Sequence, residues 1–171
     1  MQIKEFNELA HSCESKMFRL AQRILISEDA AKDAVQEVFL KLWNIRHKLG
    51  EVQNMNAYAM RMTKNYCFDR LKSKESQNLR LVHSNFDRKE NSIQDDMEKQ
   101  DEVEFLKRII SKLPDKERTV IHLREIEEME LHTIAEITES KEGSIRVALM
   151  RARKKIKDEL IKYRKNYKYE A

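Results

Sequence analysis

The side chains best suited to chemistry in this sequence are the lysines and arginines near its C-terminal end. From Ile145 onward basic residues outnumber acidic ones, and the apolar residues of the same segment recur at three- and four-residue steps. That spacing predicts an amphipathic helix whose outward face is basic. Because ammonium and guanidinium groups bind phosphate oxygens, the chemistry open to such a face is non-covalent recognition of a nucleic acid.

Residues for other kinds of chemistry do not stand at useful spacings. The five histidines have neither metal-ligand nor catalytic-triad spacing, and they are His11, His47, His83, His122 and His132. Cys13 and Cys67 stand alone, and the two glycines, Gly50 and Gly143, form no phosphate-binding loop. We therefore expect no metal, no cofactor, no disulfide framework and no enzymatic activity. A helical enzyme is the least supported alternative.

The composition indicates an all-α protein. The chain of 171 residues has two glycines and one proline, Pro114, so it has few of the residues that turns and hairpins use. Its length allows two small units. No apolar run approaches the roughly 18 residues of a membrane span, and Met1 to Phe6 lead into a charged segment without a signal-peptide core. A cytoplasmic location is expected.

The first unit, residues 1–75, is predicted to be a small bundle of three helices. Apolar residues from Phe6 to Leu25 follow a helical period. A second helix is expected to begin after Ser27, which is a suitable cap followed by two acidic residues. A third is expected from about Asn56 to Lys72, after a short irregular segment.

Residues 76–100 are predicted to form a flexible linker. Ser, Asn, Asp and Gln are frequent there, and no helical periodicity is sustained. Acidic residues outnumber basic ones between Ser76 and Glu104. The acidity has two interpretations: it keeps the segment solvated, or it places the segment beside a basic channel of a partner.

The second unit, residues 101–171, has the layout of a helix-turn-helix. One helix should end before Pro114, and the next should run from Asp115 to about Glu127 with the proline in its first turn. A short apolar pattern then precedes a polar break at 138–141 and the long basic helix. A second helix in this position can enter the major groove of DNA.

The candidate groove-reading and phosphate-binding residues lie on or just before this basic helix. For the groove we predict Lys141, Ser144, Arg146 and Val147, and for the DNA backbone Arg151, Lys154 and Lys155. The alternative interpretation is a basic helix that is merely solvated.

Two faces of the first unit also have the composition of binding surfaces. One exposes an apolar side chain among acids and amides, which can indicate a protein partner, and comprises Asp33, Gln36, Glu37, Leu40 and Asn44. The other interleaves an aromatic ring with cations and amides, as single-stranded DNA requires, and comprises Tyr58, Arg61, Lys64, Asn65 and Lys72. For both, an ordinary surface, with Tyr58 in the core, remains the alternative.

With these residues in place, the chain resembles the bacterial extracytoplasmic-function sigma factors of the sigma-70 superfamily, from about Phe6 to Leu160. The segment DAVQEVFLKLW at 33–43 looks like the polymerase-binding helix of that family, and AYAMRMTKN at 57–65 with Asp69 is similar to its promoter-melting segment. The C-terminal part carries further family motifs, namely Leu113 with Pro114, Arg118, Val120, Leu123 with Arg124, Ile134 to Glu136, Ile145 with Arg146, and Arg151 to Arg153.

The resemblance implies a sigma factor that directs core RNA polymerase to promoters and catalyses nothing itself. It implies that Asp33, Gln36, Glu37 and Leu40 bind core polymerase. It assigns the unpaired strand of the minus ten element to Gln53, Asn54, Asn56, Tyr58, Arg61, Lys64 and Asn65. The helix from Gly143 would read the minus thirty-five element as duplex DNA. The resemblance also implies an anti-sigma partner. This chain itself is not expected to insert into a membrane.

Two turns depart from the family pattern, because Glu128 and Glu139 stand where glycine is usual. A side chain on a left-handed turn residue costs about 1 kcal/mol. The turn before the reading helix is therefore expected to differ, with Ser140 or Lys141 as its cap. The main rival is a helix-turn-helix repressor or activator that binds a palindrome as a symmetric dimer without polymerase.

Overall fold

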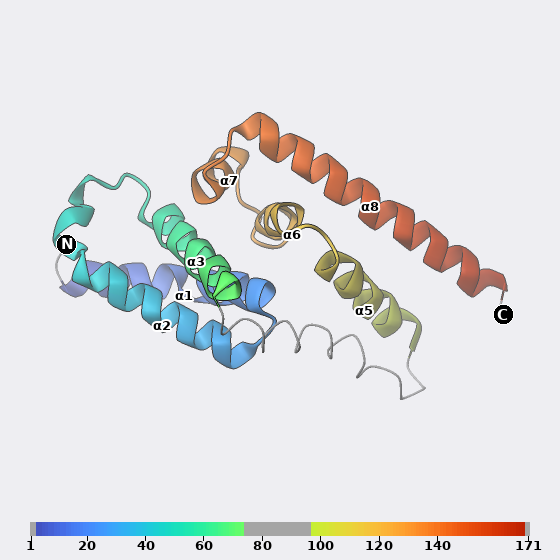
Figure 1. Cartoon of the computed structure of the whole chain (residues 1–171), viewed down its shortest axis with the longest axis horizontal. Helices are drawn as coiled ribbons and strands as arrows, with labels where there is room; N and C mark the ends of the chain where they lie inside the picture. Colours follow the sequence, from blue (N-terminus) through green and yellow to red (C-terminus); the bar gives the residue numbers. More distant parts are fainter. Residues whose placement is uncertain (1–2, 74–96, 170–171) are drawn as a thin grey trace.

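Every regular element of the described chain is a helix, as the composition predicted. The computed structural model describes residues 3–73 and 97–169, and over these ranges the helices form two bundles that lie side by side (Figure 1). We call the helices of residues 3–72 the first bundle and those of residues 97–169 the second bundle.

The first bundle contains the three expected α-helices. They are α1 (Ile3–Leu25), α2 (Glu28–Asn44) and α3 (Met55–Lys72). A 3-10 helix, η1 (Arg46–Glu51), follows α2 and ends at the start of the segment predicted to be irregular, 50–55. Ser27 caps α2 as predicted, since its Oγ accepts a hydrogen bond from the Ala30 amide at 3.2 Å. Asn54 caps α3 in the same way through Oδ1 and the Ala57 amide at 3.0 Å.

The second bundle carries the helix-turn-helix. It consists of α5 (Met97–Ser111), α6 (Asp115–Ile121), α7 (Leu131–Thr138) and α8 (Glu142–Tyr169), with a π-helical segment η2 (His122–Ile126) continuing α6. The helix predicted from Asp115 therefore widens in its second half. Pro114 lies at the N-cap of α6 and not inside its first turn, because its ψ of 145° is extended.

The linker predicted at 76–100 falls mostly outside the described residues. Only 97–100 can be compared, and these belong to α5, which begins earlier than expected. The boundary placed between residues 100 and 101 therefore cuts through a helix.

The two unusual turn residues adopt the backbone that their positions demand. Glu128 and Glu139 have φ of 53° and 54°, in the left-handed region where glycine is favoured. Glu139 is the C-cap of α7, and its amide hydrogen-bonds to the Ala135 carbonyl. The turn therefore keeps a left-handed residue with glutamate in place of glycine. α8 starts at Glu142, and the Ser144 and Ile145 amides of its first turn donate hydrogen bonds to the carbonyl of Lys141, the residue before the helix.

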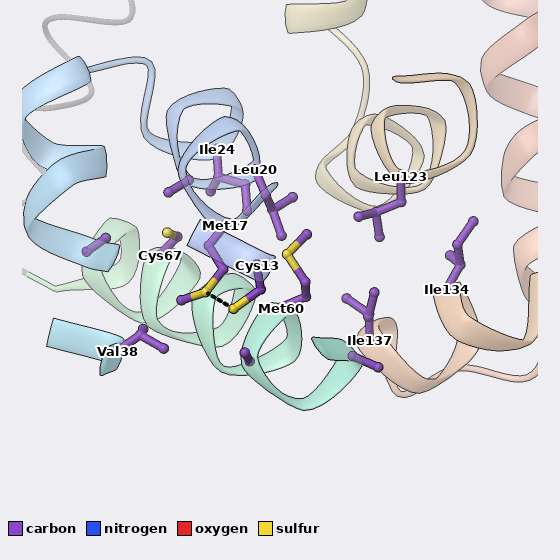
Figure 2. Packing of buried hydrophobic residues seen from close by; sticks show 14 of the residues in the cluster. Cys13, Met17, Leu20, Ile24, Val38, Met60, Cys67, Leu123, Ile134 and Ile137 are labelled. Carbon is purple, nitrogen blue, oxygen red and sulfur yellow. Dashed lines mark hydrogen bonds between the residues drawn. The ribbon is translucent and has the colours of Figure 1, made fainter. Parts of the chain in front are cut away.

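One apolar core joins the bundles. Leu20 of α1 and Met60 of α3 lie on the side of the first bundle that faces Leu123 and Ile137 (Figure 2), and all four are within 1% of complete burial. The two bundles are therefore packed against each other and not merely tethered.

A charged cluster borders this shared core. The Arg19 guanidinium of α1 donates two hydrogen bonds, of 2.7 and 2.6 Å, to the two carboxylate oxygens of Glu127, whose side chain is 1% exposed. His122 Nε2 lies 3.5 Å from the same carboxylate. Burial, only partly offset by Glu127 and reinforced by the charges of Arg23 and Arg19, lowers the pKa of His122 to about 4.

Replacing Ser27 by alanine should destabilise the protein by about 1 kcal/mol, because the Ala30 amide loses its capping oxygen. Urea unfolding measures the loss, and Ser73→Ala is the control, since the Ser73 hydroxyl follows a helix end and donates a hydrogen bond to the Arg70 carbonyl. Equal losses in the two variants would contradict the assignment of Ser27 as the functional cap.

Acid should destabilise the packed structure through His122. Its pKa is about 4 when folded and near its ordinary 6.5 when unfolded, so between these values the unfolded chain binds the proton more readily. The free energy of unfolding should thus fall as pH drops from 6.5 to 4, by up to about 3 kcal/mol from this group. Urea unfolding across this range should show a shallower fall for His122→Gln. Parallel curves would refute the assignment.

Candidate nucleic-acid and partner interfaces

The basic face of α8 is positioned by the apolar residues on its other side. Ile145, Ala148, Leu149 and Ala152 are buried against the second bundle. The helix therefore turns its remaining side chains outward, and all seven candidate DNA-binding residues of this region are exposed: Lys141, Ser144, Arg146, Val147, Arg151, Lys154 and Lys155. This is the placement that binding to a DNA groove requires.

Two of these cations have acidic neighbours inside the protein. Arg146 lies 3.4 Å from Glu142 one turn earlier, an exposed pair that costs little to break. Lys155 Nζ donates a 2.9 Å hydrogen bond to Glu117, whose side chain is only 11% exposed. Lys155 is thus directed back towards α6, whereas Lys154 and Arg151 are available along the same helix.

The candidate partner face lies along the outside of α2. Asp33, Gln36, Glu37 and Leu40 are all exposed, and Leu40 keeps 57% of its surface. Val35, Val38 and Leu42 point into the core on the opposite side, as predicted. An exposed leucine bordered by carboxylates fits a partner surface that is basic with an apolar centre.

The third set lies on α3 and the loop before it, and the structure brings its members together. Gln53, Asn54, Tyr58 and Arg61 line one cavity of about 260 Å³. The Arg61 guanidinium stands 4.9 Å from the centre of the Tyr58 ring, so an aromatic surface and a cation meet at this place. Tyr58 is half-buried and packs against the core. The ring therefore combines the two predicted alternatives, a core residue and an exposed surface for DNA bases.

Asn56 takes part in a second hollow, which the sequence did not indicate. Its Oδ1 accepts a 3.1 Å hydrogen bond from the Ser12 hydroxyl of α1, and a surface depression of about 810 Å³ opens beside it. Glu5 and Glu8 also line this depression. The spacing of apolar residues in α1 is that of an ordinary amphipathic helix, so nothing in the sequence indicated that Glu5 and Glu8 belong to a binding site.

Carboxylates of the second bundle occupy several donors of the α3 set. Glu139 accepts hydrogen bonds from Lys64 Nζ at 3.4 Å and from Asn65 Nδ2 at 3.3 Å, and Glu136 accepts one from Asn54 Nδ2 at 3.3 Å. The hydrogen bond from Asn65 and the nearby charge of Lys64 lower the pKa of Glu139. Burial lowers the pKa of Lys64, and this effect is larger than the opposite effect of the nearby Glu139 carboxylate.

Neither thiol has the environment of a nucleophile. Burial raises the pKa of Cys13 to about 11 and that of Cys67 to about 12, so both remain protonated at neutral pH. Within the described ranges no group of histidine, cysteine and acidic side chains could hold a metal ion. No described helix combines the length and apolar character that a membrane crossing requires.

Each of the two bundles contains a segment that matches a known protein family. Residues 9–77 match the family described as Sigma-70 region 2, and residues 106–156 match Sigma-70, region 4. The sequence matches none of the curated proteins with which it was compared.

Solved structures share the fold of the chain. The sigma factor RpoE of Bartonella quintana, solved with the anti-sigma factor NepR, is 19% identical with a TM-score of 0.69, and the match covers 92% of this chain and 98% of that one. CnrH, solved with the cytosolic domain of CnrY, is 20% identical with a TM-score of 0.67, over 93% of this chain and 89% of that one.

Proposed function

Because the chain belongs to the sigma-70 family as an extracytoplasmic-function sigma factor, we propose how its three exposed faces divide the work of transcription initiation. A sigma factor binds core RNA polymerase and directs initiation at particular promoters, and it is not an enzyme. The observation that carries the assignment is the order of the two matched regions, each coinciding with a bundle that exposes a binding surface.

The basic face of α8 reads the minus thirty-five element as duplex DNA. Lys141, Ser144, Arg146 and Val147 stand at the N-terminal end of the helix, which in a helix-turn-helix meets the base edges. Arg151, Lys154 and Lys155 follow along the helix and bind phosphates. The internal bond from Lys155 to Glu117 makes Lys155 the least available of the three.

The α3 face and its loop capture the unpaired strand of the minus ten element. Bases stack on aromatic rings and phosphates bind cations, and the pairing of Tyr58 with Arg61 offers both at one place. The amides of Gln53, Asn54, Asn56 and Asn65 supply hydrogen bonds to base edges, and Lys64 supplies a further cation.

The outer face of α2 docks on core polymerase. Asp33, Gln36 and Glu37 present acids and amides to the clamp coiled coil of the enzyme, and the exposed Leu40 supplies the apolar contact.

The remaining assignments follow from the family. Residues 1–75 form the unit for polymerase and the minus ten element, residues 101–171 the unit for the minus thirty-five element, and 76–100 the linker, although α5 already begins at Met97. The protein acts in the cytoplasm. An anti-sigma protein controls it, a proposal supported by the similar structure of RpoE, which holds that sigma factor with an anti-sigma factor.

A gel-shift comparison separates this function from that of a dimeric repressor. The sigma factor should shift promoter fragments only together with core polymerase, and run-off transcription on genomic fragments should then give defined start sites. Tight binding of the isolated protein to a palindrome, without polymerase, would favour the repressor.

Replacing Arg146 by alanine should weaken promoter-specific initiation by about 1–3 kcal/mol of DNA contact, because the guanidinium is exposed at the reading end of α8. Run-off transcription against promoter variants measures the loss and its sequence dependence. Lys162→Ala is the control, since Lys162 is an exposed cation of the same helix beyond the matched region. Unchanged promoter selectivity would remove Arg146 from the reading set.

Replacing Gln36 or Glu37 by lysine should reduce binding to core polymerase about tenfold or more while the thermal stability stays unchanged, because both side chains are solvent-exposed. Co-purification with tagged core polymerase measures the effect. Glu14→Lys on the exposed side of α1 makes the same charge change as Glu37→Lys but away from this face. Normal recovery of polymerase by the α2 variants would contradict the docking assignment.

A further inference from the structure

We propose that Glu136 and Glu139 form an intramolecular latch that occupies the DNA-binding groups of α3, so that the two bundles must separate before promoter DNA can bind there. The inference rests on the proposed function for the identity of the ligand. The latch is defined as these two glutamates with their partners Asn54, Lys64 and Asn65.

The latch glutamates meet the same donors that DNA would need. Each of the three hydrogen bonds runs from an amide or ammonium of the first bundle to a carboxylate of the second. Phosphate and base oxygens accept hydrogen bonds from the same groups. A carboxylate in this position therefore competes with DNA for these donors, and its negative charge repels a phosphate that approaches them.

Glu136 also lies beside the Tyr58 ring, at the wall of one cavity. It lines the cavity of about 260 Å³ together with Gln53, Asn54, Tyr58 and Arg61. A base stacked on Tyr58 would have to enter this space. The packing of α7 against α3 thus places a carboxylate at the wall of the space that a stacked base would enter.

The backbone at Glu139 supports a role for its side chain. Glu139 and Glu128 both hold the left-handed conformation, with φ of 54° and 53°. Glycine would fit both turns without strain. In the described part of the chain, Glu139 contacts α3 through its carboxylate and Glu128 makes no such contact, so the two residues form a matched pair for a test.

A second contact holds the latch closed from a distance. Arg19 of α1 binds both oxygens of the nearly inaccessible Glu127 carboxylate. Without Arg19 the closed form would leave that buried carboxylate with only the neutral His122 ring, whose Nε2 lies 3.5 Å away, whereas in the separated form water would solvate it. Loss of Arg19 should therefore favour separation while leaving every proposed DNA-binding residue in place.

Distances between spin labels in the full chain test the closed form. Labels on cysteines introduced by Lys48→Cys and Lys157→Cys report on the two bundles, since both positions are exposed and the native Cys13 and Cys67 are buried. Arg19→Ala and the double variant Glu136→Lys/Glu139→Lys should lower the population at the short distance, and Glu128→Lys should not. An unchanged distribution in both variants, or an equal change with Glu128→Lys, would overturn the latch.

Initiation assays test whether opening helps DNA. With core polymerase and limiting sigma factor, Arg19→Ala should raise loading onto promoter DNA with an unpaired minus ten region by roughly two- to tenfold, because a larger fraction of the chain is competent. The variant removes a positive charge, so non-specific electrostatics would act in the opposite direction. Opening without a gain in loading would overturn the inference.

Failure of the unmodified chain to initiate with core polymerase would contradict the proposed function instead. The label distances would still decide whether the contact between the bundles depends on these charges. Circular dichroism of each variant checks that the helices remain folded.

Discussion

The arrangement depends on a carboxylate that is buried between two helical bundles. Glu127 is nearly inaccessible and needs a cation, and Arg19 supplies two hydrogen bonds from the other bundle. A buried charge left without its partner is costly, so this pair ties the end of η2 to α1. The apolar contact of Met60 and Ile137 beside it then sets α7 against α3. The coverage of the candidate face on α3 follows from this packing.

Of the three faces, two are open and one is engaged. The outer side of α2 and the basic side of α8 face solvent, whereas the DNA-binding side of α3 contacts α7. A sigma factor binds core polymerase, duplex DNA and an unpaired strand, and these three binding events occur in sequence. In the scheme that we propose, the free form presents the polymerase and duplex surfaces first, and the surface for unpaired DNA becomes available when the bundles separate.

Local features were predictable from the sequence, and contacts between the bundles were not. Apolar spacing predicted α1, α2 and α3, and Ser27 was identified as a cap, because these depend on neighbours within one turn. The π-helical end of α6 was missed, since a single widened turn leaves no periodic signal. The positions of Glu136 and Glu139 against α3 depend on polar pairs more than 70 residues apart, which no spacing encodes. The unusual glutamate at 139 was noticed, but its partner was not foreseeable. The roles of the loop residues Gln53, Asn54 and Asn56 came from the family resemblance alone.

Site-specific photocrosslinking in a reconstituted initiation complex tests the central claim most directly. A photoreactive residue at position 58 should crosslink to the unpaired strand of the minus ten element, and one at position 147 to the minus thirty-five duplex, both only when core polymerase is present. Crosslinks from both positions to one short duplex site in the absence of polymerase would contradict the account.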